Sequence, residues 1–586
     1  MIFTRKNRYT EITFEDNENI AFINKYEEKL GKFTGVREPG YEKSRAYKSG
    51  YWDGYTLLYD KSNHRLPDGL FDQLIEFSDT IKEQVSGYSY KVVDDREELF
   101  MGEEDVPQGM TFKDGDNEYT LFDYQYNSVK SAIGSGKGIL HLSTNAGKTG
   151  VSVSIIKTLS KYLERGEKVI YFVPSKAIFE QAIKTMQENF GKNAVGYIGD
   201  GKRKISTINV VIMLSMVSSL KDPTKGKDVK VTGKARTLQI FIDEVAPLFD
   251  NANQKSILSN LAKSYKPTTK ARTEILGWIK KADEECPTDN RVKLYINSKK
   301  AEYRKLMQGK VGTKYKKYED TLKLVSETKI VLVDEGHHSK SDTTFDTLLR
   351  FTNAPYMYAM TGSIDTKDKL SSQRLKGIYH KVIYTVSNNE LIERGISAKP
   401  TINLINIKGN LGLTSEEDKN YMAVYEKGIV KYDVRNDLIV GLTKKMVEKG
   451  KTSLLIVNRV EHGEILKEKF DEVGVKSKFI SGDTSTEDRE IAKEEVKNNE
   501  LKVLIATSIF DEGVSINNID VLFMVSSTKS LRLILQRVGR VLRKKSGDNK
   551  ALVFDFVDMT HIFLKNHAKD RIKIYKDQNF DIKYLN

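Results

Sequence analysis

Short apolar runs alternate with helix-like amphipathic stretches along most of the chain, and each run has the length of one buried strand. A first set of runs lies at 139–142, 169–173, 210–214, 330–333 and 356–360. A second set lies at 453–457, 478–481, 503–506, 521–525 and 552–556, within roughly residues 395–560. The alternation predicts βαβ units around parallel sheets, so the expected fold class is α/β with two similar halves.

The first 105 residues do not follow this alternation and are expected to form a small α+β accessory domain. An amphipathic helix is predicted over 70–81, and Asp53-Gly54 between two aromatic runs predicts a hairpin within 49–59. Trp52 lies near Lys61 and other basic residues, an arrangement that could stack on nucleic-acid bases. The same aromatics could equally form the core of the small domain.

Domain boundaries follow from changes in composition. Residues 102–118 are acidic and glycine-bearing and are expected to be a linker. The first α/β lobe is assigned to 119–394 and the second, with a helical tail, to 395–586. Between about 221 and 328 the pattern breaks into lysine-rich, largely helical sequence, which we interpret as a basic insertion in the first lobe. Its charge could mark a DNA contact, or the solvated surface of a helical insert.

Charge and composition narrow the possible binding partners, the kinds of metal or disulfide site and the expected cellular location. The chain has 586 residues, with Lys+Arg 95 against Asp+Glu 81 and a formal net charge of +14, which favours a polyanionic partner. The single cysteine, Cys286, excludes an intramolecular disulfide framework and a multi-cysteine metal site. No apolar stretch reaches the roughly 18 residues of a membrane span, so we expect a soluble, cytoplasmic protein without membrane partners.

Two adjacent carboxylates, Asp334 and Glu335, directly follow the apolar run 330–333. A parallel sheet delivers such residues to the crevice beyond its carboxyl edge. There, Asp334 could hold a hydrated Mg²⁺ while Glu335 orients or deprotonates a water for attack on the γ-phosphate of ATP. The alternative is an ordinary strand end followed by a solvated turn.

A candidate phosphate loop, Ser143-Thr144-Asn145-Ala146-Gly147-Lys148-Thr149, follows the run 139–142 and opens a helix. Backbone N–H groups at such a helix start bind phosphates. Lys148 could reach the β- and γ-phosphates, and the Thr149 hydroxyl could join the Mg²⁺ shell. Leu142 replaces the first glycine of the strict pattern, and Asn145 stands where helicase loops often have glycine, although asparagine tolerates left-handed backbone angles.

Two similar-looking segments are rejected as the site. Residues 134–138, Gly-Ser-Gly-Lys-Gly, precede the strand, and no serine or threonine follows their lysine. Asp243 and Glu244 imitate the carboxylate pair but fall inside the expected insertion.

Taken in order, the motifs resemble those of the superfamily-two nucleic-acid helicases. Residues 334–337 look like the DExH motif, 361–363 like motif III, 122–125 like the adenine-sensing glutamine motif and 506–515 like motif V. Residues 536–543, QRVGRVLR, match motif VI closely. The resemblance covers about residues 121–560 apart from the insertion, and it implies two RecA-like parallel-sheet lobes.

The resemblance also implies roles for individual residues. Arg540 and Arg543, three apart on a predicted helix, would lie on one face and could reach the γ-phosphate as arginine fingers. The alternative is that they are surface arginines. His337 and Gln536 would couple the two lobes. The remaining implied contacts are with nucleotide at Tyr124, Gln125, Ser143, Thr144, Asn145, Ala146, Gly147, Lys148, Thr149 and Gly513, and with nucleic acid at Pro174, Ser175, Lys176, Ser215 and Thr507.

A narrower likeness is present near the N-terminus. Residues 51–54, YWDG, and 66–70, LPDGL, are similar to the leading domain of phage recombination helicases of the UvsW type. This likeness implies an ATP- and Mg²⁺-dependent DNA helicase or translocase that unwinds or branch-migrates forked and recombination-type DNA in replication, recombination or repair. It further implies a monomer, replication or recombination proteins as partners, and the host cytoplasm if the chain is phage-encoded.

Three alternatives stay open. The motor could act on RNA, or it could be the translocating subunit of a restriction enzyme, because such motifs read the nucleic-acid backbone rather than its bases. From another class, the chain could be an ATP-gated DNA clamp or annealing module without processive unwinding.

Overall fold

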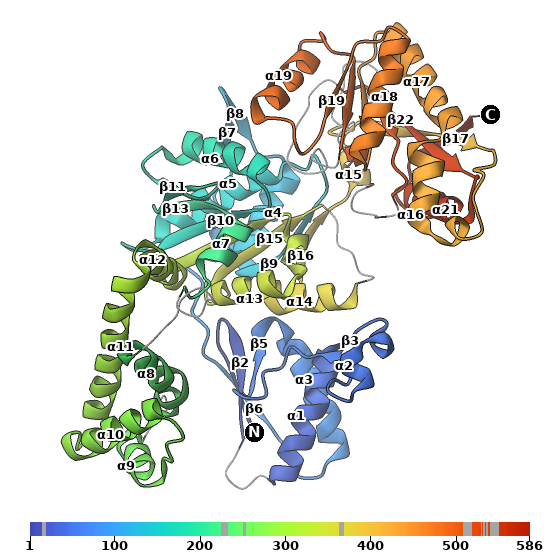
Figure 1. Ribbon diagram of the computed structural model, residues 1–586. Coiled ribbons are helices and arrows are strands. Elements are labelled where there is room, and N and C mark those ends of the chain that lie inside the picture. The colour runs from blue at the N-terminus through green and yellow to red at the C-terminus, as the bar shows by residue number, and fades with distance from the viewer. Residues whose placement is uncertain are drawn as a thin grey trace. The chain divides into compact units, whose positions relative to one another are not determined.

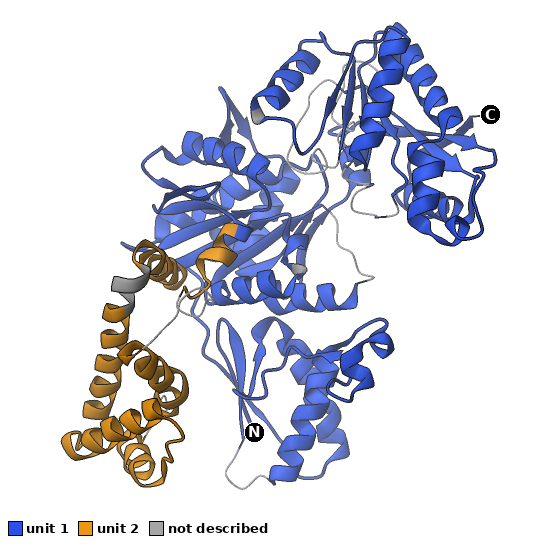
Figure 2. Ribbon diagram, in the orientation of Figure 1, with its two compact units in different colours: residues 1–214, 328–586 blue, residues 215–327 orange. Residues whose placement is uncertain are grey.

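The computed structural model describes residues 1–14, 19–223, 233–249, 253–362, 368–507, 519–528, 530, 534, 537–539 and 550–585. The chain divides into two compact units, one of residues 1–214 and 328–586 and the other of residues 215–327 (Figure 2). The first unit holds a small N-terminal sheet and two larger parallel sheets. The α/β fold class, with two RecA-like lobes and a small N-terminal α+β region, is thereby confirmed.

The N-terminal region is a four-stranded sheet of order β5-β2-β1-β6, packed on two helices. Its core joins Phe3 of the first strand to Leu30 and Leu74 of the helices. The expected helix over 70–81 is confirmed as α3. The elements are β1 (Ile2–Arg5), β2 (Tyr9–Thr13), β5 (Arg65–Pro67), β6 (Lys91–Asp94), α1 (Ile20–Thr34), α2 (Arg45–Lys48) and α3 (Phe71–Gln84).

The hairpin predicted within 49–59 is wrong. Strand β4 (Tyr55–Thr56) pairs antiparallel with β3 (Val36–Arg37), which lies well before it in the chain. The indole N–H of Trp52 donates to the carbonyl of Tyr55 at 2.7 Å, which holds 52–55 as a tight loop. The Asp53-Gly54 turn therefore redirects the chain without pairing its two flanks.

The first lobe is built on an eight-stranded sheet of order β12-β11-β13-β10-β14-β15-β9-β16. All its pairings are parallel except that of the edge strand β12 with β11. Central strands such as β10, KVIYFV, are buried along nearly their whole length, as expected of a sheet covered on both faces. The strands are β9 (Lys137–Leu142), β10 (Lys168–Val173), β11 (Val195–Gly199), β12 (Lys202–Lys204), β13 (Ile208–Ile212), β14 (Thr328–Asp334), β15 (Tyr356–Thr361) and β16 (Val382–Val386).

Helices cover both faces of this sheet. Figure 1 shows α5 and α6 on one face and α13 and α14 on the other. The strand predicted at 210–214 ends earlier than expected, because α7 already begins at Met213. The helices are α4 (Asp123–Ser135), α5 (Lys148–Leu159), α6 (Lys176–Phe190), α7 (Met213–Ser219), α13 (Asp342–Phe351), α14 (Lys369–Tyr379) and α15 (Asn388–Glu393).

The segment 102–118, expected to be a linker, is partly ordered structure of the first lobe. It contains β7 (Thr111–Asp114), which pairs antiparallel with β8 (Asn117–Thr120). Phe112 packs against the core of the lobe, and the backbone N–H of Lys113 donates to the Asn189 side chain at 2.8 Å. Val106 is buried in the same core and Met110 also packs against it, so a few apolar residues dock this otherwise polar stretch.

The second lobe is a seven-stranded sheet of order β19-β20-β18-β21-β22-β17-β23, and every described pairing in it is parallel. The basic tail forms α21, anchored by a buried ion pair of 2.8 Å between Arg571 and Asp555 of β22. The elements are β17 (Lys399–Ile407), β18 (Ser453–Ile456), β19 (Ser477–Ile480), β20 (Val503–Ala506), β21 (Val521–Met524), β22 (Lys550–Asp558), β23 (Asp581–Leu585), α16 (Tyr421–Tyr425), α17 (Asp433–Glu448), α18 (Val460–Glu472), α19 (Thr486–Lys497) and α21 (Ile562–Asp577).

The second unit, residues 215–327, is helical and has a core of its own. Phe241, Ile275, Ile279 and Ile296 are fully or almost fully buried in that core. Its helices are α8 (Lys234–Ile240), α9 (Gln254–Ser264), α10 (Lys270–Glu285), α11 (Asp289–Val311) and α12 (Thr313–Glu327).

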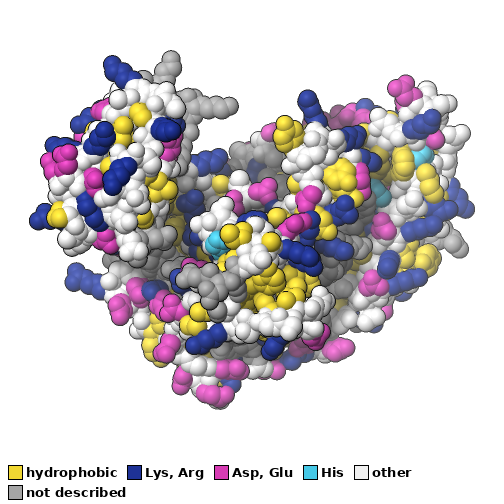
Figure 3. Space-filling model, turned by 90° about the horizontal axis from the view of Figure 1, so that it is seen from below, with side chains coloured by type: hydrophobic (Ala, Val, Ile, Leu, Met, Phe, Trp, Pro, Cys, Tyr) yellow, Lys and Arg dark blue, Asp and Glu magenta, His cyan; other side chains and the backbone are white. Residues whose placement is uncertain are grey.

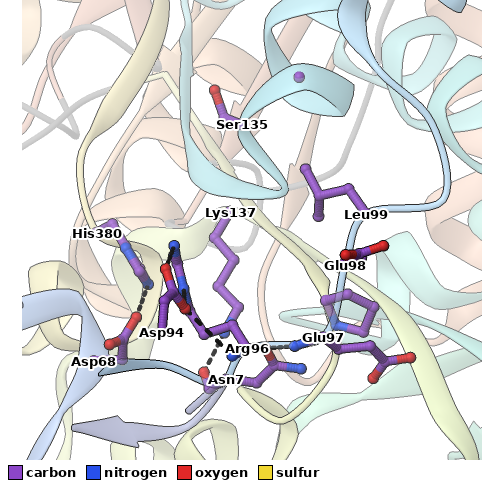
Figure 4. Close-up of a pocket in the computed structure, with 12 residues that line it drawn as sticks. Asn7, Asp68, Asp94, Arg96, Glu97, Glu98, Leu99, Ser135, Lys137 and His380 are labelled. Carbon is purple, nitrogen blue, oxygen red and sulfur yellow. Dashed lines mark hydrogen bonds and ion pairs between the residues drawn. The ribbon is translucent and has the colours of Figure 1, made fainter. Parts of the chain in front are cut away.

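Where the N-terminal region meets the first lobe, polar residues line a cavity of about 500 Å³ (Figure 4). The Lys137 amine donates to the carbonyls of Asn7 and Thr352, and burial lowers the pKa of this lysine to about 8. His380 lies 3.7 Å from the buried Asp68. Lys137 is the lysine of the rejected segment 134–138. Its amine binds carbonyls where the N-terminal region meets the first lobe.

Candidate nucleotide site

The site is positioned by three neighbouring strands of the first lobe, in the order β14, β15, β9. Because the three strands are parallel, their carboxyl ends lie at one edge of the sheet. That edge carries residues 143–149 after β9, the carboxylates after β14, and Thr361-Gly362 at the end of β15. Ligands of open α/β sheets bind at this kind of edge.

The loop between β9 and α5 has the backbone that a phosphate cradle requires. Asn145 and Gly147 both adopt left-handed angles, with φ of 72° and 76°. The sequence-based expectation that asparagine could replace a glycine here is confirmed. Ala146 is fully buried and fixes the loop against the core, while Ser143 is buried and Thr144 partly exposed.

Gln125 holds this loop from behind. Its side-chain oxygen accepts from the Phe122 backbone N–H at 2.9 Å, and its amide donates to the Ala146 carbonyl at 2.9 Å. Since an amide nitrogen carries two N–H groups, the bond to Ala146 uses only one of them. Tyr124 is buried in the core, where burial raises its pKa to about 12.

Lys148 and Glu335 form an ion pair across the site. The amine and the carboxylate oxygen lie 2.9 Å apart, with 18% and 14% of the two side chains exposed. Burial alone would lower the pKa of Lys148, but Glu335 and then Asp334 outweigh it and raise that pKa. Lys148 is thus a buried cation held by the two carboxylates after β14.

The two adjacent carboxyls differ in proton affinity. Burial and the neighbouring charge of Glu335 raise the pKa of Asp334 to about 6. Burial also acts to raise the pKa of Glu335, but Lys148 and His337 reverse this and hold it below its usual range. Glu335 therefore stays ionised, whereas Asp334 takes up a proton more readily than an ordinary aspartate, and a cation bound at Asp334 would favour its ionised form.

Glu335 has a strained backbone. Its φ of 49° and ψ of 53° are left-handed, which is uncommon for a residue with a long side chain. Such strain clusters at functional sites because the surrounding fold holds it in place.

A short polar chain links the carboxylates to the end of β15. The imidazole Nδ1 of His337 lies 3.1 Å from the Thr361 hydroxyl and 3.3 Å from the Glu335 carboxylate. The His337 ring is thus in contact with both Glu335 and Thr361.

Oxygen ligands for a hard cation are present in the donor set. Thr149 is exposed at the first turn of α5, and Asp334 ends β14. A hydroxyl and a carboxylate suit Mg²⁺, which keeps several waters and takes only one or two protein ligands beside substrate phosphates. Among the described residues no group of three or more His, Cys, Asp or Glu could hold a metal ion unaided.

The residues expected from the sequence to contact nucleic acid lie in different settings, and Ser215 lies inside a helix rather than after a strand. Pro174 and Ser175 follow β10, and exposed Lys176 pairs with Asp200. Thr507 follows β20 and is buried. The other two are Ser215, within α7, and Trp52, in the loop before β4.

Four expected site residues, Gln536, Arg540, Arg543 and Gly513, lie outside the described residues. Their described neighbour Gly539 accepts a hydrogen bond of 3.0 Å from the Asn145 side chain of the loop. The motif VI segment therefore touches the candidate phosphate loop at this point.

Sequence reasoning missed three residues at or near this site. Phe122 is 53% exposed beside Gln125, as an aromatic surface on which a base could stack. Arg394 pairs with Asp123 at 2.6 Å and lies over the Tyr124 ring. Arg537 is fully buried and donates to the Ser526 hydroxyl at 2.6 Å, which anchors the motif VI segment. Phe122 and Arg537 lie within the glutamine motif and motif VI, which was a visible signal, whereas Arg394 lies outside every motif.

Comparison with known proteins gives two family matches. Residues 118–265 match the family described as type III restriction enzyme, res subunit, and residues 433–545 match the helicase conserved C-terminal domain. The ATP-dependent DNA helicase uvsW of Enterobacteria phage T4 is 22% identical, over 94% of this chain and 94% of its own length. The putative ATP-dependent helicase IRC3 of Saccharomyces cerevisiae is 23% identical over 40% of this chain and 35% of its own. The crystal structure of T4 UvsW covers all of both chains, with a TM-score of 0.41 and 18% identity.

Proposed function

We propose that this chain, a UvsW-like helicase of superfamily two and an ATP-hydrolysing enzyme that acts on nucleic acid, unwinds or branch-migrates forked and recombination-type DNA. The relative that spans nearly all of it is named as a DNA helicase, which supports DNA as the track. In this proposal the two parallel-sheet lobes bind and hydrolyse ATP, and the N-terminal region and the insertion are candidates for binding the DNA.

The observation that carries the proposal is the chain of contacts from Lys148 through Glu335 and His337 to Thr361. It joins the ends of β9, β14 and β15 at one edge of the sheet. A triphosphate in the loop would compete with Glu335 for Lys148, because both present anionic oxygens to the same amine. Nucleotide entry would thus free Glu335 and disturb the link to Thr361.

In this proposal the residues have distinct tasks. Backbone N–H groups of the loop and the Lys148 amine bind the β- and γ-phosphates. The Thr149 hydroxyl and Asp334 would hold Mg²⁺, which supplies neutralisation of phosphate charge when bound. Glu335, whose pKa is held low by Lys148 and His337 so that it stays ionised, accepts the proton of the attacking water.

The second lobe completes the site. Arg540 and Arg543 are proposed to stabilise the charge of the transition state, and Gln536 to couple the lobes. The hydrogen bond from Asn145 to Gly539 supports a motif VI segment that approaches the loop. Gly513 and Gln125 are proposed to contact the nucleotide.

The proposed contacts with the nucleic acid are made mainly by residues that follow strands β10 and β20 of the two lobes. Ser175 caps α6, and its buried hydroxyl has no hydrogen-bond partner, so it could donate to a phosphate oxygen. The other proposed positions are Pro174, Lys176, Ser215, Thr507 and Trp52.

ATPase stimulation across a matched set of nucleic acids tests the choice of track. Single strands, duplexes, forks and four-way junctions would be compared as DNA and as RNA of the same sequence. We expect the highest kcat/KM for ATP with branched DNA. Stimulation by RNA alone would overturn the proposed track, and equal stimulation by unbranched duplex would favour a restriction-type translocase.

A further inference from the structure

The helical unit of residues 215–327 holds most of the net positive charge of the chain. It contains 24 lysines and arginines against 14 aspartates and glutamates, a net +10 out of the +14 of the whole sequence. The unit is about a fifth of the chain, so the rest is close to neutral for its size. Figure 3 shows lysine and arginine side chains standing out from the surface of the insertion, at the left of the view.

This charge is carried by a folded body. Helices α8 to α11 share a core that buries Phe241, Ile275, Ile279, Val292 and Ile296. Rigid helices hold their surface cations in fixed register, which a disordered lysine-rich loop would not do.

Three of the cations form a stripe along α11. Lys293, Lys300 and Arg304 are spaced seven and four residues apart, which places them on one face of the helix. At 1.5 Å of rise per residue the stripe is about 16 Å long. Lys293 and Arg304 are exposed, and Lys300 is half-buried.

Several described carboxylates of this unit pair with cations outside the stripe. Glu302 pairs with Lys234 and Lys299, and Glu244 pairs with Arg272. Within the described part of the chain, no ion pair involves Lys293, Lys300 or Arg304. The stripe therefore keeps its full charge for an external anion.

We propose that the insertion is a second nucleic-acid-binding surface, which grips the phosphate backbone of DNA through the stripe of Lys293, Lys300 and Arg304. A backbone is a row of single negative charges, and a row of unneutralised cations on a rigid helix is its complement. The contact needs no base recognition, so it suits a motor that must advance over any sequence. The inference rests on the proposed action on DNA for the identity of the polyanion.

The test compares three full-length proteins: the wild type, a stripe variant and a control variant. The stripe variant carries Lys293→Gln, Lys300→Gln and Arg304→Gln. The control carries Lys263→Gln, Lys270→Gln and Lys281→Gln, which remove the same charge from exposed positions on α9 and α10. Fluorescence anisotropy measures binding to one duplex, as DNA and as RNA, over a series of salt concentrations, and circular dichroism verifies that all three are folded.

The stripe variant should lose about 2 to 3 from the slope of log K against log salt, and roughly tenfold to a hundredfold in affinity near 0.1 M salt. The control should lose less than about 1 from the slope. Equal losses in both variants, or no loss in either, would overturn the inference while leaving DNA binding by the wild type intact. If the wild type binds only RNA, the proposed track fails, and the same comparison on RNA still decides whether the stripe grips a backbone.

Discussion

Replacing Glu335 by glutamine tests the nucleotide site most sharply, because it removes one charge and almost no volume. The structure places that charge 2.9 Å from the Lys148 amine, with both side chains largely buried. At an effective dielectric constant of about 20, two unit charges at this distance attract with about 6 kcal/mol before desolvation is subtracted. The substitution therefore changes two separate properties, catalysis and the stability of the nucleotide-free protein.

For catalysis, we expect kcat for nucleic-acid-stimulated ATP hydrolysis to fall by about a hundredfold to ten-thousandfold, since the water loses its proton acceptor. Nucleotide binding should persist, because Lys148 and the loop remain.

For stability, the buried Lys148 loses its nearest partner, although Asp334 still compensates part of its charge. Removing one member of a buried ion pair lowers the free energy of unfolding by up to about 3 to 5 kcal/mol. We expect a smaller loss of about 1 to 3 kcal/mol here, because Asp334 still neutralises part of the Lys148 charge. Nucleotide phosphates would replace the lost carboxylate, so ATP should raise the melting temperature of Glu335→Gln more than that of the wild type.

The assay is steady-state ATP hydrolysis together with thermal unfolding, with and without nucleotide. Glu244→Gln serves as the control, because Glu244 belongs to the rejected look-alike pair and binds an exposed Arg272. Turnover within tenfold of the wild type would refute the role of Glu335. An equal nucleotide-induced shift in wild type and variant would refute the competition for Lys148.

Three further predictions follow from the geometry. Gln125→Ala removes the bond to the Ala146 carbonyl and should raise KM for ATP about tenfold with a smaller change in kcat; an unchanged KM would contradict its support of the loop. Thr361→Val removes the hydroxyl beside His337, and should lower DNA unwinding far more than ATP hydrolysis, which parallel measurement of both rates would reveal. Burial lowers the pKa of His380 from 6.5 to about 4. Between these pH values the unfolded chain binds a proton at His380 that the folded protein does not bind, so the free energy of unfolding decreases as the pH is lowered. In urea unfolding, the loss of stability from pH 7.5 to pH 5 should be about 2 kcal/mol smaller in His380→Asn than in the wild type, where buried His462 adds a loss of its own; an equal loss in both proteins would contradict this.

The sheets and the candidate site were largely predictable, because both depend on strong local signals. A fully apolar run such as 330–333 has few alternatives to a buried strand, and a carboxylate pair at its end is then carried to the sheet edge. The positive φ of Asn145 was predictable for the same reason, since few residues tolerate it.

What the sequence could not reveal depends on contacts between distant segments. The pairing of Tyr55–Thr56 with Val36–Arg37 and the docking of Phe112 depend on partners far along the chain. The Lys148–Glu335 ion pair joins residues 187 positions apart, and neither local sequence indicates that the two side chains are in contact. The burial of Lys137, which looked like a phosphate-loop lysine, likewise needs the N-terminal region for its explanation.

The central claim is that ATP hydrolysis at this site drives strand exchange in branched DNA. Its most direct test is single-turnover branch migration of a mobile four-way DNA junction by the wild type, with ATP or with a non-hydrolysable analogue. We predict separated product strands with ATP, and with the analogue a bound junction but no product. Product formed equally with the analogue, or binding without product under both conditions, would contradict the claim and identify the chain as an ATP-gated clamp or annealing module.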